Sequence, residues 1–300
     1  MEFFKNDSWI FFSILSALSL SIVSIIDRYV LLKWIKNPLI PIFVLGIMGL
    51  IPSLIIYIIH GYAQLSLIHV LLAFVAGVSF LFMAYFYFSA AKIEEISRVV
   101  PLFYIAPIFV AILSSIFLHE VLSFYKYLGV FFLISGSILI SLKKQIKYYL
   151  SKALGLMILS TFFYSIHMVI TKYLLNFADY WRIFSYIRIG IFITLVPIFP
   201  RFLPEIRSIF DRHGKKVFGI MAANETMGLA GGFFFTIAAS TGYVTLVNAL
   251  SSISTFFVFL FTLIIGLFYP QILKEEKGKV KVFLKFMAVV FMFLGVLLMT

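Results

Sequence analysis

The sequence predicts an all-α integral membrane protein, with ten transmembrane helices arranged as two inverted five-helix repeats. The first observation is composition, because the mean hydropathy is +1.12 and 63% of residues are hydrophobic against 12% charged. The second is length: a helix needs about 20 apolar residues to cross a bilayer, and ten such segments follow one another. The third is an internal repeat that relates the two halves. Together these observations exclude a soluble globular protein.

The ten apolar segments are joined by short connections, which leave no room for an aqueous catalytic domain. We predict spans at residues 9–32, 39–59, 67–90, 96–118, 124–142, 153–175, 181–200, 218–240, 243–268 and 281–299. These segments are continuously apolar rather than alternating, which excludes a closed barrel. The first repeat would occupy residues 1–142, a basic linker residues 143–152, and the second repeat residues 153–300.

The repeat is visible in short stretches that match between the halves. Residues 27–31 correspond to 171–175, residues 90–102 correspond to 238–250, and the spacing of Lys126 and Gly136 recurs in Lys285 and Gly295. An odd number of spans in each repeat forces the second copy to enter the bilayer upside down. Two inverted repeats are the usual architecture of a secondary transporter.

The net charge of +12 comes from basic side chains in the predicted loops. Most of them fall on the side opposite the two termini. The positive-inside rule places that side in the cytoplasm and the termini outside it. The charge indicates contact with anionic lipid headgroups rather than with nucleic acid. The absence of cysteine excludes disulfides and thiolate metal sites.

Polar side chains form stripes on four of the predicted spans. Turned at 100° per residue, the first and sixth spans each align such residues on one face, and so do the fourth and ninth. The predicted stripes contain Ser16, Asp27, Ser97, Tyr104, Tyr164, His167, Thr171, Thr245, Asn248 and Ser252. Polar groups in membrane helices normally face the bundle interior or a wet cavity, which predicts a central binding cavity. Alternatively, small hydroxyl residues only let helices pack closely.

Three further polar residues lie within spans of the second half and have no charged counterparts in the first. Arg188 is near the middle of the seventh span, while Asn224 and Glu225 lie within the eighth. A central charge costs about 2.5–3.5 kcal/mol on insertion scales, so it indicates a role. One hypothesis makes Arg188 an anchor for an anionic solute and Glu225 a proton-carrying or cation-binding carboxylate. The other makes them a structural ion pair between the two spans.

The chain contains no enzyme motif that we can identify. His119 and Glu120 lack the second histidine of a zinc-protease helix, and neither a glycine-rich phosphate loop nor a nucleophile elbow is present. We therefore predict a protein that is not an enzyme and that needs no cofactor and no metal.

Residues 84–141 resemble the repeat unit of the EamA type in the drug/metabolite transporter superfamily. The matching features are Ala90-Ala91, the run 97–102, Pro107, Glu120, Gly129 and Gly136, followed in the second half by residues 246–250, Glu275 or Glu276, and Gly295. The resemblance implies a ten-helix carrier of small organic solutes that works by alternating access, often coupled to protons or to exchange. It also implies a cavity lined by spans 1, 3, 4, 6, 8 and 9. The chain departs from the family in two respects. Its charge bias is opposite to that expected for the cytoplasmic termini usual in the family, and a basic segment at 274–281 is inserted between spans 9 and 10.

The function predicted from the residues and the resemblance together is secondary active transport of a small metabolite or drug. The expected partners are a small-molecule solute, membrane lipids and, as coupling ion, protons, with the chain acting as a monomer or homodimer in the cell membrane. The alternative is a channel or lipid scramblase, which would need a continuous polar path through the bilayer.

Overall fold

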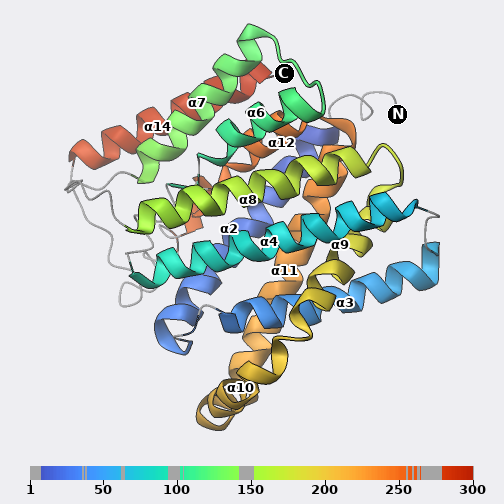
Figure 1. Ribbon diagram of the computed structural model, residues 1–300. Helices are drawn as coiled ribbons and strands as arrows, with labels where there is room; N and C mark the ends of the chain where they lie inside the picture. The colour runs from blue at the N-terminus through green and yellow to red at the C-terminus, as the bar shows by residue number, and fades with distance from the viewer. Residues whose placement is uncertain are drawn as a thin grey trace.

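The fold is described from a computed structural model of the 300-residue chain. It describes residues 8–35, 37, 39–61, 65–93, 102–103, 105–141, 152–254, 256–258, 260–261, 264 and 279–299. The predicted linker at 143–152 lies almost entirely outside these ranges. Every regular element among the described residues is a helix, which confirms the all-α prediction (Figure 1).

The first half contributes α2 (Ser8–Lys33), α3 (Leu39–His60), α4 (Leu67–Ile93), α6 (Ala106–Phe117) and α7 (Phe124–Ser141). The second half contributes α8 (Lys152–Leu174), α9 (Tyr180–Leu195), α10 (Phe199–His213), α11 (Lys215–Thr241), α12 (Val244–Ser251) and α14 (Lys279–Met299). By length and composition, α2, α3, α4 and α8 can each cross a membrane, and a fifth span results if α9 and α10 are counted together. The chain is thus a multi-pass membrane protein, but the predicted count of ten spans is not confirmed.

Two predicted spans are interrupted among the described residues. In the fourth, predicted at 96–118, α6 begins at Ala106 with Pro107 in its first turn, and residues 102 and 103 ahead of it are also helical. Proline has no backbone N–H and suits the first turn of a helix, where that donor would be unpaired. In the ninth, predicted at 243–268, α12 ends at Ser251 with Ser252 as its C-cap, and after a turn the described residues 254, 256–258, 260–261 and 264 are helical again.

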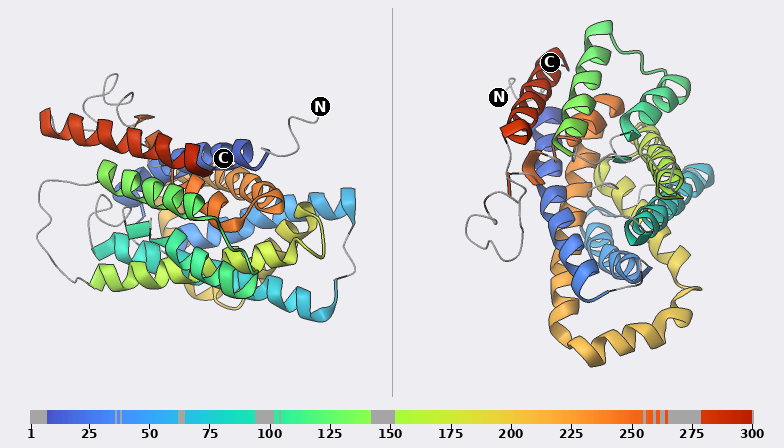
Figure 2. Two further views of the ribbon diagram at one scale, coloured as in Figure 1. Left: turned by 90° about the horizontal axis from the view of Figure 1, so that it is seen from above. Right: turned by 90° about the vertical axis from the view of Figure 1, so that its left-hand side faces the viewer.

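The predicted polar connection between spans seven and eight is instead a helix, α10. Pro197 lies between α9 and α10, and Pro200 occupies the first turn of α10. The two helices are bent by 88° relative to each other. As a result α10 runs across one end of the bundle, nearly perpendicular to α9 and α11 (Figure 2).

Helices of one half pack against helices of the other. The main pairs are α2 with α11, α4 with α8, α3 with α9, and α7 with α14 (Figure 1). The crossing of α7 and α14 uses the repeat-related glycines. A Cβ on Gly136 would lie 2.7 Å from the Ala288 carbonyl oxygen, and one on Gly295 would lie 2.8 Å from the Gly129 carbonyl oxygen. The last helices of the two halves thus approach each other closely through one glycine from each.

The turn between α11 and α12 is held by two charged side chains. Lys172 of α8 donates from Nζ to the carbonyl oxygens of Ala239 (2.6 Å) and Gly242 (2.8 Å). Glu120, buried in the connection between α6 and α7, accepts from the Val244 backbone N–H at 3.0 Å. The positive Lys172 thus caps the C-terminus of α11 and the negative Glu120 caps the N-terminus of α12, as the helix dipoles favour. A lysine near a helix end commonly extends to the membrane interface, but Lys172 bonds to these carbonyls instead.

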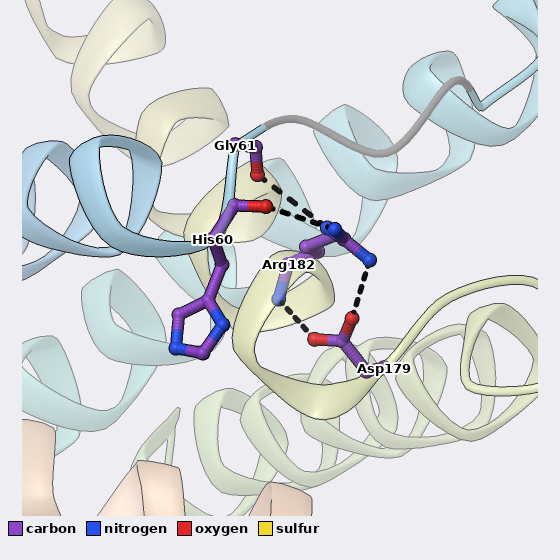
Figure 3. A network of polar contacts seen from close by, with 4 residues as sticks. All are labelled: His60, Gly61, Asp179 and Arg182. Carbon is purple, nitrogen blue, oxygen red and sulfur yellow. Dashed lines mark hydrogen bonds and ion pairs between the residues drawn. The ribbon is translucent and has the colours of Figure 1, made fainter.

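A second basic side chain caps α3. The Arg182 guanidinium donates to the His60 carbonyl at 2.8 Å and to the Gly61 carbonyl at 3.4 Å, while Asp179 holds it at 2.8 Å (Figure 3). Asp179 is also the N-cap of α9, accepting from the Arg182 backbone N–H. This contact fixes the end of α3 against the start of α9.

Candidate functional site

Arg188 lies inside the bundle on α9, where it is only 8% exposed. Its guanidinium carbon is 5.3 Å from the ring centroid of Phe80 and 5.2 Å from that of Phe184. Two glycines leave it room: a Cβ on Gly232 would lie 3.0 Å from Nη2, and one on Gly49 would lie 3.1 Å from Cδ. Aromatic faces attract a cation, but they offer no conventional hydrogen-bond acceptor to the five N–H donors of a guanidinium. Nη1 of Arg188 is buried and has no hydrogen-bond partner.

Asp27 and Asn224 meet across α2 and α11. Nδ2 of Asn224 donates to Oδ1 of Asp27 at 2.7 Å, while Oδ1 of Asn224 is buried without a partner. These two residues and Glu225 line a cavity of about 10 Å³, together with Val30, Pro41 and Met221. That volume holds about one water molecule, so the cavity can take a small ion or a water but no organic solute.

Glu225 and Arg188 interact electrostatically, but they do not touch. Glu225 is within electrostatic reach of both Arg188 and Asp27. Among the described residues, no nitrogen of Arg188 comes within 4.0 Å of an oxygen of Glu225, so no direct ion pair joins α9 to α11. Glu225 thus interacts with both a cation and a second carboxylate. The predicted structural pair, in its direct form, is not present.

Two residues of the predicted α8 stripe join neighbouring helices. Nδ1 of His167 donates to the Ala76 carbonyl of α4 at 2.9 Å, and its ring centroid is 5.2 Å from that of Phe80. His167 therefore supports the ring that faces Arg188. Tyr164 shares a hydrogen bond with Asn248 of α12, which connects α8 to α12.

The remaining predicted residues fall into three groups. Ser16 is fully buried on α2, and its hydroxyl has no partner. Thr171 and Ser252 donate to carbonyls of their own segments, those of His167 and Ala249, and Thr245 pairs with Ser114 of α6 at 2.8 Å. The hydroxyls of these three residues thus form bonds within the protein. Ser97 and Tyr104 lie outside the described residues.

Sequence analysis missed the aromatic lining of Arg188. Phe80 and Phe184 are two of 37 phenylalanines, and nothing in their local sequence separates them from lipid-facing ones. Ser185 follows Phe184 on α9, and its buried hydroxyl also lacks a partner. The described part of the chain thus contains four buried side-chain atoms without hydrogen bonds, on Ser16, Ser185, Arg188 and Asn224. All four belong to α2, α9 and α11.

Residues 7–142 match the EamA-like transporter family. That family is part of the drug/metabolite transporter superfamily. Members of the EamA-like family are membrane transporters. A search of curated proteins finds no match to the sequence. Among solved structures, 28 chains match. One, described only as the crystal structure of a protein, superposes with a TM-score of 0.71 at 13% identity and covers 98% of both chains. At that identity the likeness shows a shared fold, and it extends over the second half.

Proposed function

We propose that this EamA-like protein is a secondary active transporter that moves a small anionic organic solute by alternating access. The observation that supports this most strongly is the set of four unpartnered buried polar atoms on α2, α9 and α11. Buried polar groups are nearly always hydrogen-bonded, so unpartnered ones point to a ligand or water that completes them. Their location between helices of the two halves is where repeat-built transporters bind their solutes.

The chemistry of Arg188 favours a carboxylate or phosphate on the solute. A guanidinium presents five donors in a planar fork that matches such groups bidentately. Here it is held by phenylalanine rings rather than by an acidic partner. An anion that binds Nη1 would both satisfy the unpartnered donor and compensate the buried charge.

Asp27 and Glu225 are the proposed groups for ion coupling. Two carboxylates that share a dry site cannot both ionise without an added cation. The cavity between them is too small for an organic solute but sufficient for one proton-bearing water. We propose that proton binding here balances solute binding at Arg188, since Glu225 interacts with both Asp27 and Arg188. The reciprocal packing of the halves supports movement of one repeat against the other.

The membrane orientation is proposed from the charge distribution. The basic connections would face the cytoplasm and the termini the outside, with the chain in the cell membrane as a monomer or homodimer. The alternative, a channel or scramblase, would require a continuous polar path through the bilayer.

Thermal stabilisation of the purified protein across a library of acidic, basic and neutral metabolites tests the proposal. A ligand that binds only the folded state raises the melting temperature. We expect the hits to be carboxylates or phosphates, and Arg188→Gln to abolish their effect. The charge-matched control Lys126→Gln, at a site away from Arg188, should retain it. Hits confined to neutral or cationic compounds, or an unchanged response in Arg188→Gln, would contradict the proposed anchor.

Uptake into proteoliposomes with an identified hit then tests coupling. A carrier should show saturable uptake stimulated by counter-solute, whereas a channel should not. With Glu225→Gln we expect folded protein that still exchanges solute but no longer accumulates it against a gradient. Accumulation at the wild-type level would remove Glu225 from the coupling mechanism.

A further inference from the structure

The helix α10 lies at one end of the bundle, the end at which the sequence places the basic connections (Figure 2). It follows α9, which has 16 residues and therefore spans about 24 Å at 1.5 Å per residue. The hydrocarbon core is about 30 Å thick, so the chain is still close to the interface where α10 begins. From there α10 turns by 88° and runs along the end of the bundle rather than away from it (Figure 2).

One face of α10 is fixed to the bundle. Ile209 is buried with Val30 and Met221 of α2 and α11, and Phe202 and Ile206 pack against the same cluster. Glu205 accepts a hydrogen bond from Asn37 at 2.6 Å. The helix is thus held in a defined rotational position, and its opposite face is presented outward in a reproducible way.

The outward face forms a hollow of about 400 Å³. It is lined by Pro200, Leu203, Pro204, Arg207, Ser208, Asp211 and Arg212. Within the described residues, neither Arg207 nor Arg212 forms an ion pair with a carboxylate. The lining therefore combines two available guanidinium groups with a hydroxyl, a carboxylate and an apolar rim.

We propose that this hollow binds the headgroup of an anionic phospholipid. Guanidinium groups bind phosphate through paired charge-assisted hydrogen bonds, so Arg207 and Arg212 would hold the phosphodiester. Pro204 and Leu203 would contact the glycerol and upper acyl chain, and Asp211 would accept from headgroup hydroxyls. The orientation predicted from charge places α10 at the cytoplasmic leaflet, which carries the anionic lipids.

Comparison with Lys215 and Lys216, two exposed lysines at the start of α11, distinguishes a specific lipid site from diffuse electrostatic attraction. They lie next to α10 and have the same charge as the two arginines, but they do not line the hollow. A general basic surface would attract anionic lipid through all four residues equally. A specific site would depend mainly on Arg207 and Arg212.

The experiment measures binding of phosphatidylglycerol and phosphatidylcholine to the full-length protein in detergent by native mass spectrometry. Wild-type protein should retain phosphatidylglycerol in preference to phosphatidylcholine. Each basic residue near an anionic surface contributes about fivefold in affinity, so Arg207→Gln/Arg212→Gln should weaken phosphatidylglycerol binding about 25-fold. Lys215→Gln/Lys216→Gln should weaken it less than fivefold.

Several outcomes would overturn the assignment. Equal losses in the two double variants would mean diffuse attraction, and equal retention of the two lipids by wild-type protein would mean no recognition of the anion. Displacement of phosphatidylglycerol by millimolar inorganic phosphate would mean a free-phosphate site. Unchanged melting temperatures in detergent would show that both variants are folded. If Arg207→Gln/Arg212→Gln does not fold, Arg207→Lys/Arg212→Lys replaces it. The lysines keep the charge but lack the bidentate geometry, so the affinity should still fall several-fold.

Discussion

Replacing Lys172 with methionine should detach the turn between α11 and α12 from α8. The ammonium group donates to the Ala239 and Gly242 carbonyls at 2.6 and 2.8 Å. Hydrogen bonds to charged groups contribute about 1.5–3 kcal/mol each. Methionine keeps most of the apolar stem but leaves both carbonyls unpaired and removes the positive neighbour of Glu120. Because Lys172 is only half-buried, water replaces part of the loss, and we expect about 2–4 kcal/mol of destabilisation.

Equilibrium unfolding in mixed micelles measures this change, with tryptophan fluorescence as the probe. Trp9 packs directly on Gly242, where an added Cβ would lie 2.9 Å from Trp9 Cγ, so its emission reports on this turn. The matched control is Lys126→Met, because Nζ of Lys126 lies 6.0 Å from the Tyr243 ring and makes only a cation–π contact, which is worth about 1 kcal/mol or less. If both variants lose the same stability, the capping role of Lys172 is wrong.

Three further changes test other parts of the fold. Burial raises the pKa of Glu120 above its ordinary 4.5. The unfolding free energy should therefore fall as the pH rises from about 4.5 through the folded-state pKa. Glu120→Gln removes the titrating group and should flatten this pH profile. Gly136→Ala places a Cβ 2.7 Å from a backbone oxygen of α14 and should cost about 1–3 kcal/mol in the same unfolding assay, whereas Gly155→Ala, with nothing within 4 Å, should be neutral or stabilising by up to about 1 kcal/mol. Asp179→Ala removes the N-cap of α9 and should cost about 1 kcal/mol by thermal melting; a loss no larger than that of an exposed serine variant on another helix would contradict the cap.

Hydropathy and the repeat predicted the helical membrane fold, because apolar length is a direct requirement of the bilayer. They failed at α10, because residues 201–217 fall between the seventh and eighth predicted spans and were expected to form a polar connection. Phe202, Ile206 and Ile209 are nevertheless spaced at helical intervals, and this pattern could have revealed an amphipathic helix. A proline in the first turn is compatible with such a helix.

The polar stripes located part of the candidate site but could not assign roles within it. Asp27 and Thr171 both lie on predicted stripes, yet Asp27 bonds across helices to Asn224 while Thr171 bonds to its own backbone. A threonine hydroxyl can always reach a carbonyl one turn earlier, and sequence gives no means of knowing which bond it makes. The phenylalanine faces around Arg188 depend on tertiary packing and could not be predicted.

The pairing of helices across the two halves has a consequence for how the chain folds. During synthesis, α2, α3, α4 and α7 are made before α11, α9, α8 and α14, the partners that cover them. The first half therefore inserts with one face of each of these helices uncovered, and cooperative packing begins only when the second half enters the bilayer. The whole chain is the folding unit, and two separately expressed halves should recover the native fold only when they are made together.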